Sequence, residues 1–240
     1  MFRLSSLHSI IRRQSSKQAR RRNVAMILHG CGVYDGSEIH EATSMLIHLD
    51  RHRVNLSIFA PDRDQVDVIN HMNGSTMNEK RNVLIESARI ARGNVHSLDD
   101  LNASQFDALF IPGGFGVAKN LSNFASQNAS CTLLAKLEDI VKKFHSDGKP
   151  MGFCCIAPII AARCIPGVEI TLGKESEQKS DSAHQAVIKM GANHIACDTT
   201  DIHVDSKAKV VTTPAYMSSK ATIFEVYTGI GKMVDAVLSM

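Results

Sequence analysis

The chain has 240 residues, of which 44% are hydrophobic and 21% are charged, a composition typical of globular proteins rather than of disordered or fibrous ones. Its net charge of +3 is unevenly distributed, because residues 1–22 contain seven Lys and Arg side chains and no acidic one. The other 218 residues carry 20 basic and 24 acidic side chains, about −4 in total. A nucleic-acid-binding protein needs clustered positive charge, so we do not expect one here.

Residues 1–22 are rich in arginine and serine, and they place Leu4, Leu7, Ile10 and Ile11 at the spacing of one helix face. An amphipathic, acid-free start of this kind is typical of mitochondrial transit peptides. Its apolar run is too interrupted for a secretory signal, and no later segment reaches the ~18 apolar residues of a membrane span. We therefore predict a transit peptide at 1–22, a protein of the mitochondrial matrix and no role in a membrane.

The six cysteines are irregularly spaced and form no CxxC pair. Secreted disulfide frameworks and structural zinc sites both require more regular spacing. We expect free thiols and no metal site.

From residue 23 onward, short apolar runs alternate with helical periodicity, as in α/β proteins with a mostly parallel sheet. We expect one doubly wound domain over 23–240, with Asn73-Gly74 as a hairpin turn. The first helix should start near Ser37, be capped by Ser37 or Asp35, and bury Ile39, Ala42, Met45, Leu46 and Leu49. The other predicted helices are 82–92, 133–145, one from 156, 184–190 and 223–238; the predicted strands are 24–28, 54–59, 106–111, 151–154, 168–172, 195–197 and an antiparallel pair within 204–216.

Ligands of open parallel sheets bind beyond the carboxyl ends of the strands. Three loops at such positions carry reactive or glycine-rich sequence: 29–32 leading to Glu38, 112–116, and 154–158. We expect these three loops to form the functional site.

The loop at 154–158 places cysteine between a core strand and a helix start, where free amides and the helix dipole favour a thiolate. Pro158 suits the first turn of that helix. Strand alternation should turn Phe153 and Cys155 to one side and Cys154 to the other. We predict that Cys155 is the nucleophile, in the manner of a nucleophile elbow, and that Cys154 is a buried neighbour.

The glycine turn at Gly113 and Gly114 permits close approach of the backbone to a ligand. With the amide of Ile156, the amides of these glycines are predicted to form an oxyanion hole. Glu38 and Glu41 lie three residues apart at the start of the first helix, on nearly one face.

Together these segments resemble a known family, the ElbB-like branch of the ThiJ/PfpI (class I glutamine amidotransferase-like) superfamily, which includes mitochondrial glutamine amidotransferase-like class 1 domain proteins. The similar segments are 35–42, 82–93, 112–116, 152–158 and 210–215. The resemblance implies a flavodoxin-like three-layer α/β sandwich with Cys155 at the elbow. It also implies a glutamate beside that cysteine, which we assign to Glu38 with Glu41 as the alternative.

The resemblance further implies a glutathione-independent glyoxalase or protein deglycase that acts on small dicarbonyl or glycated substrates without a cofactor. We also expect a homodimer. The alternative is a non-catalytic family member that senses oxidants through Cys155 or binds a partner.

Two departures from the motifs of related proteins count against catalysis. Class I amidotransferases carry a G-x-C-x-G elbow and a later H-x-E motif. In this chain the elbow at 152–158 reads GFCCIAP, and the nearest later motif is His203-Val204-Asp205. We expect His203 on a peripheral strand. An amidotransferase is therefore the third choice. Lys174 also stands where relatives are expected to have histidine, and His29 is the remaining histidine near the predicted site.

Overall fold

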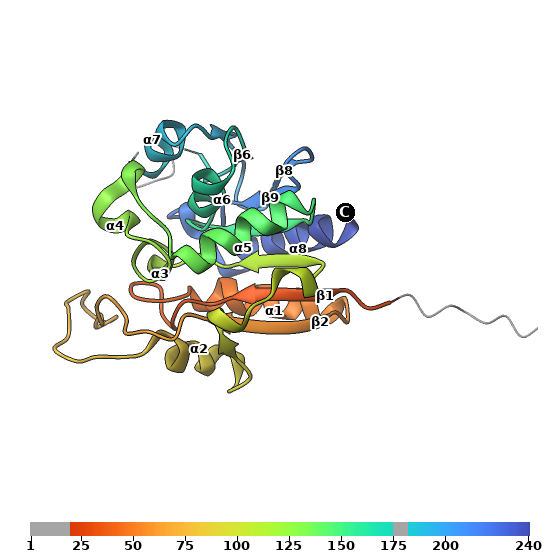
Figure 1. Cartoon of the computed structure of the whole chain (residues 1–240). Helices are drawn as coiled ribbons and strands as arrows, with labels where there is room; N and C mark the ends of the chain where they lie inside the picture. Colours follow the sequence, from red (N-terminus) through yellow and green to blue (C-terminus); the bar gives the residue numbers. More distant parts are fainter. Residues whose placement is uncertain (1–19, 175–181) are drawn as a thin grey trace, which may run out of the picture.

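The computed structural model describes residues 20–174 and 182–240 (Figure 1). In these residues a seven-stranded sheet has the order β3-β2-β1-β4-β5-β9-β8, and only β8 runs antiparallel to its neighbour. The strands are β1 (Asn23–Ile27), β2 (Asn55–Ala60), β3 (His96–Ser97), β4 (Ala108–Ile111), β5 (Met151–Cys154), β8 (His203–Asp205) and β9 (Val210–Thr213). The predicted mostly parallel α/β sheet is confirmed.

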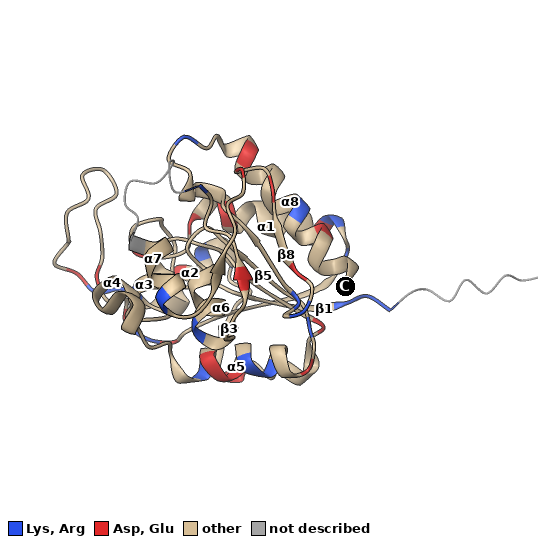
Figure 2. Ribbon diagram, turned by 90° about the horizontal axis from the view of Figure 1, so that it is seen from above, with Lys and Arg blue, Asp and Glu red and all other residues tan. Residues whose placement is uncertain are grey.

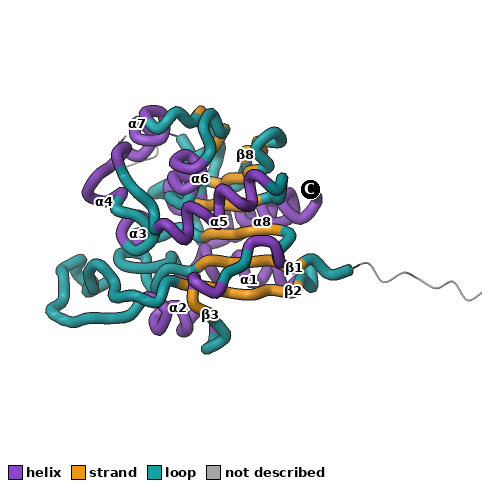
Figure 3. The backbone as a smooth tube through the Cα atoms, in the orientation of Figure 1, coloured by secondary structure: helices purple, strands orange, loops and turns teal. Residues whose placement is uncertain are grey.

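Helices cover both faces of the sheet, which gives three layers (Figures 2 and 3). One face is covered by α1 (Ile39–Arg51), α2 (Val83–Ala91) and α8 (Ile223–Ser239). The other face is covered by α3 (Phe115–Lys119), α4 (Phe124–Gln127), α5 (Ala135–Ser146), α6 (Pro158–Cys164) and α7 (Ser182–Lys189). The fold is therefore the flavodoxin-like sandwich expected from the sequence.

Strand alternation builds the two cores. In β1, Val24 and Met26 belong to the core under α1 and α8, whereas Ala25 and Ile27 belong to the core on the opposite face. All four side chains are fully buried, which explains why this strand is continuously apolar, as parallel strands covered on both faces are.

Three local predictions were wrong. The expected strand at 195–197 is not formed, and Ile195 is 37% exposed. Instead β7 (Asn193–His194) pairs with β6 (Glu169–Ile170) in a separate two-stranded sheet. Residue Ile39, expected in the core, is 46% exposed.

The cap of α1 is the third difference from the prediction. Glu38 is the N-cap, and its Oε2 accepts the amide of Glu41 at 2.7 Å. The two predicted caps are engaged elsewhere: the Ser37 hydroxyl accepts the amide of His29, and Asp35 accepts the amide of Ile69.

Residues 62–82 form a long excursion from the fold (Figure 1), and residues 71–80 are all exposed. It turns where the Asn70 carbonyl accepts the amide of Gly74, which has a φ of +76°. Its base is tied to the carboxyl edge of the sheet, since Asp67 pairs with Lys119 at 2.8 Å.

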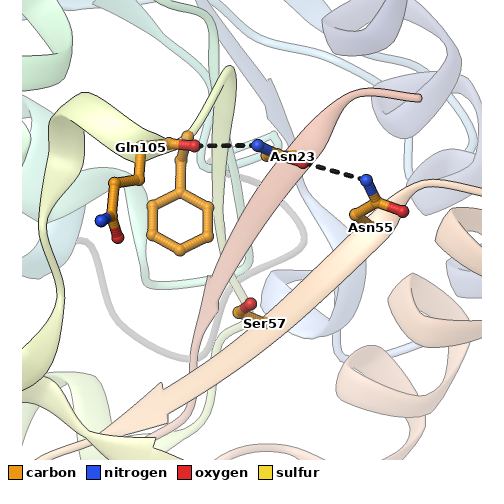
Figure 4. Close-up of a pocket in the computed structure, with 5 residues that line it drawn as sticks. Asn23, Asn55, Ser57 and Gln105 are labelled. Atoms are coloured by element: carbon orange, nitrogen blue, oxygen red, sulfur yellow. Dashed lines mark hydrogen bonds between the residues drawn. The ribbon is translucent and has the colours of Figure 1, made fainter. Parts of the chain in front are cut away.

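A hollow of about 470 Å³ lies at the opposite edge of the sheet (Figure 4). It is lined by Asn23, Asn55, Ser57, Gln105 and Phe106. Asn23 and Asn55 begin β1 and β2, so this hollow is at the amino ends of the strands. It is therefore remote from the three loops predicted to form the functional site.

Candidate active site

The three predicted loops meet at the carboxyl edge of the sheet. Backbone hydrogen bonds join the first two: the amide of Glu38 donates to the carbonyl of Gly113 at 2.9 Å, and the amide of Phe115 donates to that of Val33 at 2.8 Å. The third loop contacts the second directly, because a Cβ on Gly113 would lie 2.4 Å from the Cβ of Cys155. The convergence of the loops, expected from the parallel sheet, is present.

Cys155 occupies a sharp strand-to-helix turn between β5 and α6. Its φ is +57°, a left-handed conformation that is uncommon for residues other than glycine. Its amide donates to the carbonyl of Thr213 at 3.1 Å, and Pro158 begins α6, as predicted. The backbone of Cys155 thus has the strained geometry of an elbow.

The positive φ overturns the predicted separation of the two cysteines. Phe153 lies in the core under α5 and α6, but Cys154 and Cys155 both belong to the core under α1 and α8. Strand alternation ends at Cys154, because the left-handed turn redirects the next side chain. Both thiols therefore approach the same carboxyl group, that of Glu41.

Glu41 is fully buried between the three loops. Its Oε2 accepts the amide of Gly113 at 2.9 Å and the thiol of Cys154 at 3.6 Å, and its Oε1 accepts the amide of Tyr216 at 3.3 Å. The sulfur of Cys155 lies near the same carboxylate, since a Cβ on Gly113 would be 2.6 Å from Oε2 of Glu41 and 2.9 Å from that sulfur. Burial, reinforced by the nearby Glu38 charge, raises the pKa of Glu41 to about 7.

Glu38 has a different position from Glu41. Its carboxylate caps α1 through the amide of Glu41 and lies 3.7 Å from Nδ1 of His40 at the surface. Burial raises the pKa of Glu38 as well. Of the two glutamates left open by the sequence, the structure thus places Glu41 against the thiols and Glu38 behind it.

The predicted oxyanion-hole amides are not equivalent. The amides of Gly114 and Ile156 face the sulfur of Cys155, whereas the amide of Gly113 donates to Glu41. Only the first two are directed at the sulfur. Gly113 serves the site by lacking a side chain, since a Cβ there would also lie 2.6 Å from the Glu41 carboxylate.

Cys155 is buried, with 8% of the residue exposed. Burial and the charge of ionised Glu41 raise the pKa of Cys155, and the amides of Gly114 and Ile156 lower it by less. The effect of burial on the pKa of Cys155 is therefore larger than that of the helix terminus, which the sequence analysis expected to hold a thiolate. Cys155 needs a base to take its proton, and the adjacent Glu41 carboxylate is placed to do so.

Sequence reasoning missed three residues around this site. The amide of Tyr216 holds Glu41, and its hydroxyl is 2.9 Å from Nδ1 of His40. Asn120 is 1% exposed and donates to the carbonyls of His29 and Asp35 at 2.9 and 2.8 Å, which fixes the first loop. Single polar residues such as these carry no periodic signal. His40 nevertheless lies within the segment 35–42 that resembles the family, and Tyr216 directly follows the segment 210–215.

Three other residues singled out in the sequence, His29, His203 and Lys174, have their partners away from the thiols of Cys154 and Cys155. His29 is buried, its Nε2 donates to the Pro112 carbonyl at 3.1 Å, and burial lowers its pKa to about 4. His203 lies on β8, as expected, 3.0 Å from Glu169. Lys174 pairs with Asp198.

Within residues 20–174 and 182–240, no group of three or more His, Cys, Asp or Glu side chains is arranged to hold a metal ion. No helix in the same part of the chain has the length and hydropathy required to cross a membrane. Most of the predicted transit peptide, residues 1–22, lies outside the described residues.

The chain is similar to two mitochondrial proteins over most of its length. It is 48% identical to the rat ES1 protein homolog, mitochondrial, over 94% of this chain and 86% of that protein. It is also 48% identical to human glutamine amidotransferase-like class 1 domain-containing protein 3, mitochondrial, over 90% of this chain and 82% of the relative. The mitochondrial localisation predicted from the sequence is confirmed by these relatives.

A solved structure has the same fold. The crystal structure of an isoprenoid biosynthesis protein with amidotransferase-like domain from Ehrlichia chaffeensis superposes with a TM-score of 0.82 at 37% identity. The match covers 90% of this chain and 99% of that chain. The DJ-1/PfpI family profile matches residues 35–212, a range that contains Glu41, Gly113 and Cys155. The chain belongs to the DJ-1/PfpI family.

Proposed function

We propose that this mitochondrial protein is a cysteine-dependent glyoxalase that converts small dicarbonyls into hydroxy acids without glutathione, with removal of early glycation adducts as a related activity. The observation that carries the proposal is the proximity of the Cys155 sulfur to the buried carboxylate of Glu41, since a Cβ on Gly113 would lie within 2.9 Å of both. A base whose pKa is about 7 is matched to proton transfer at physiological pH. An elbow cysteine beside such a base is suited to add to an aldehyde.

The first step is formation of a hemithioacetal. The carboxylate of Glu41 takes the proton of Cys155 while the sulfur adds to an aldehyde carbon of glyoxal. The aldehyde oxygen becomes an alkoxide, which the amides of Gly114 and Ile156 can stabilise because both face the sulfur. Glu41 then returns the proton to that oxygen.

The second step is an internal redox exchange between the two carbons of the substrate. Glu41 removes the proton from the carbon that bears sulfur, and the resulting enediol is reprotonated on the neighbouring carbon. The product is a thioester of glycolic acid on Cys155. Water hydrolyses it, which releases glycolate and restores the thiol, so the net reaction is glyoxal plus water to glycolic acid.

The test is to incubate the purified protein with glyoxal or methylglyoxal and to measure hydroxy-acid formation. Cys155→Ala should abolish turnover, whereas Cys154→Ala, which removes a thiol from the same core, should keep most of it. Equal activity of the two variants, or no turnover by the wild type, contradicts the proposal.

A further inference from the structure

The reaction proposed above uses one thiol, but the structure places two at the same carboxyl group. The thiol of Cys154 donates to Oε2 of Glu41 at 3.6 Å, and the sulfur of Cys155 lies near the same oxygen, since a Cβ on Gly113 would be 2.9 Å from that sulfur and 2.6 Å from Oε2. This convergence follows from the left-handed backbone of Cys155, with φ of +57°. In a regular strand, the two side chains would lie on opposite faces of the sheet.

The two residues differ in access to solvent. Cys155 is 8% exposed and Cys154 is fully buried. A small oxidant such as hydrogen peroxide can therefore reach Cys155 first, and the product forms beside a protected second thiol. An oxidisable cysteine next to a resolving one is typical of reversible redox sites.

We infer that Cys154 is a resolving thiol, which captures oxidised Cys155 as a reversible Cys154–Cys155 disulfide. In the first step, the Cys155 sulfur attacks one oxygen of hydrogen peroxide, the O–O bond breaks, and sulfenic acid and one water form. In the second step, the Cys154 sulfur attacks the sulfenic sulfur and displaces a second water. The two thiols lose two electrons and two protons, and peroxide takes up both.

Glu41 links the two steps. Its carboxylate contacts the Cys154 thiol, so it can accept the proton of that thiol as the sulfur attacks. The same group lies near the Cys155 sulfur and can pass this proton to the departing hydroxide. Without a base at this point, a fully buried thiol has no route to the nucleophilic thiolate form.

The chain connectivity makes this disulfide easy to reduce. Adjacent Cα atoms are about 3.8 Å apart across a trans peptide, whereas ordinary disulfides join Cα atoms about 4.4–6.8 Å apart. A bond at shorter spacing is strained, and strained disulfides are the labile ones. The bond would thus shield Cys155 from irreversible oxidation to sulfinic acid and be released by a thiol reductant.

The sequence permits a direct test by peptide mass. Trypsin does not cleave at Lys149 because Pro150 follows, so one peptide spans 144–163 and contains Cys154 and Cys155 but no other cysteine. The full chain is treated with equimolar hydrogen peroxide, free thiols are blocked with iodoacetamide, and the digest is analysed by tandem mass spectrometry. The expected product is this peptide with two hydrogens lost and neither cysteine alkylated.

Three variants test which cysteines form the disulfide. Cys155→Ala should leave the peptide unoxidised, and Cys154→Ala should replace the disulfide by sulfinic acid at Cys155. Cys164→Ala is the matched control, since Cys164 is also buried but lies outside the peptide, and it should keep the wild-type disulfide. If Cys154→Ala does not fold, as judged by circular dichroism, Cys154→Ser is used instead.

The wild-type peptide alone can overturn the inference. Sulfinic acid at Cys155 with Cys154 alkylated, or a peptide that stays fully reduced, excludes a resolving role for Cys154. Millimolar glutathione should return most of the oxidised peptide to the reduced form, and resistance to this treatment also contradicts the inference. These masses do not depend on glyoxal turnover, so failure of the proposed function and failure of the disulfide are told apart.

Discussion

At the scale of single residues, the site depends on how burial divides two neighbouring glutamates between different tasks. Glu41 is enclosed by the loops, and its pKa rises to about 7, whereas Glu38 caps the helix that presents Glu41. The charge of Glu38 contributes to the raised pKa of Glu41. One carboxylate thus tunes the other, which is common where like charges share a site.

This coupling predicts a pH dependence with a definite sign. The base is the ionised form of Glu41, so kcat/KM for glyoxal should rise as the pH increases through about 7. Glu41→Gln should lower kcat/KM by about 10²–10⁴-fold, the usual contribution of a general base. Glu38→Gln keeps an acceptor oxygen but removes the charge, so its pH profile should shift to lower pH. A Glu38→Gln profile that coincides with that of the wild type contradicts the coupling.

At the scale of elements, the contact between α1 and α8 illustrates what local propensity cannot predict. Gly229 and Gly231 lie within α8, where glycine costs about 1 kcal/mol relative to alanine. A Cβ on Gly231 would lie 2.6 Å from the His48 ring of α1, and one on Gly229 would lie 2.5 Å from the carbonyl of Thr199. The glycines weaken the helix locally but permit the close packing of α8.

Gly231→Ala should therefore destabilise the protein, although helix propensity alone predicts the opposite. The His48 ring cannot withdraw easily, because its Nε2 is held by the Tyr227 carbonyl at 3.1 Å. Overpacking costs about 1–3 kcal/mol, so we expect a net loss of about 1 kcal/mol in the free energy of unfolding, measured with urea. Thr43→Ala at an exposed position of α1 is the control and should be neutral or slightly stabilising. A more stable Gly231→Ala protein would show that the contact relaxes freely.

At the scale of the whole molecule, charge separates the start of the chain from the folded body. The described chain begins in a basic stretch at 20–22, visible in blue where the chain enters the fold (Figure 2). Residues 23–240 carry about −4 in total. The positive charge of the chain is therefore concentrated in residues 1–22, as expected of a targeting sequence.

This division predicts that residues 1–22 are sufficient for import. Fusion of this segment to a fluorescent protein should direct the reporter to mitochondria, as judged by colocalisation and fractionation. Replacement of Arg3, Arg12 and Arg13 by glutamate should abolish import, because acidic residues are avoided in transit peptides. A wild-type fusion that stays in the cytosol means that the address lies elsewhere in the chain.

The sequence by itself determined the order of the main strands and helices, the edge of the sheet that carries the site, and the choice of its three loops. These features follow from short-range patterns: continuous apolar runs for β1, β4 and β5, helical periodicity, and glycine at turns. The short β3 and β7 escaped prediction, because strands of two residues carry almost no pattern, and β6 lies within the longer strand predicted at 168–172.

Only the tertiary structure decided which glutamate meets the thiols, that the amide of Gly113 is bound to Glu41, and that Cys154 and Cys155 share one carboxylate. Each depends on a contact between segments far apart in the chain, such as the bond from Gly113 to Glu41 across 72 residues, or on the left-handed φ of Cys155. Strand alternation and helix periodicity describe a side chain relative to its own element. They cannot tell which distant backbone will approach it, because that is fixed by the packing of the whole sheet and its helices.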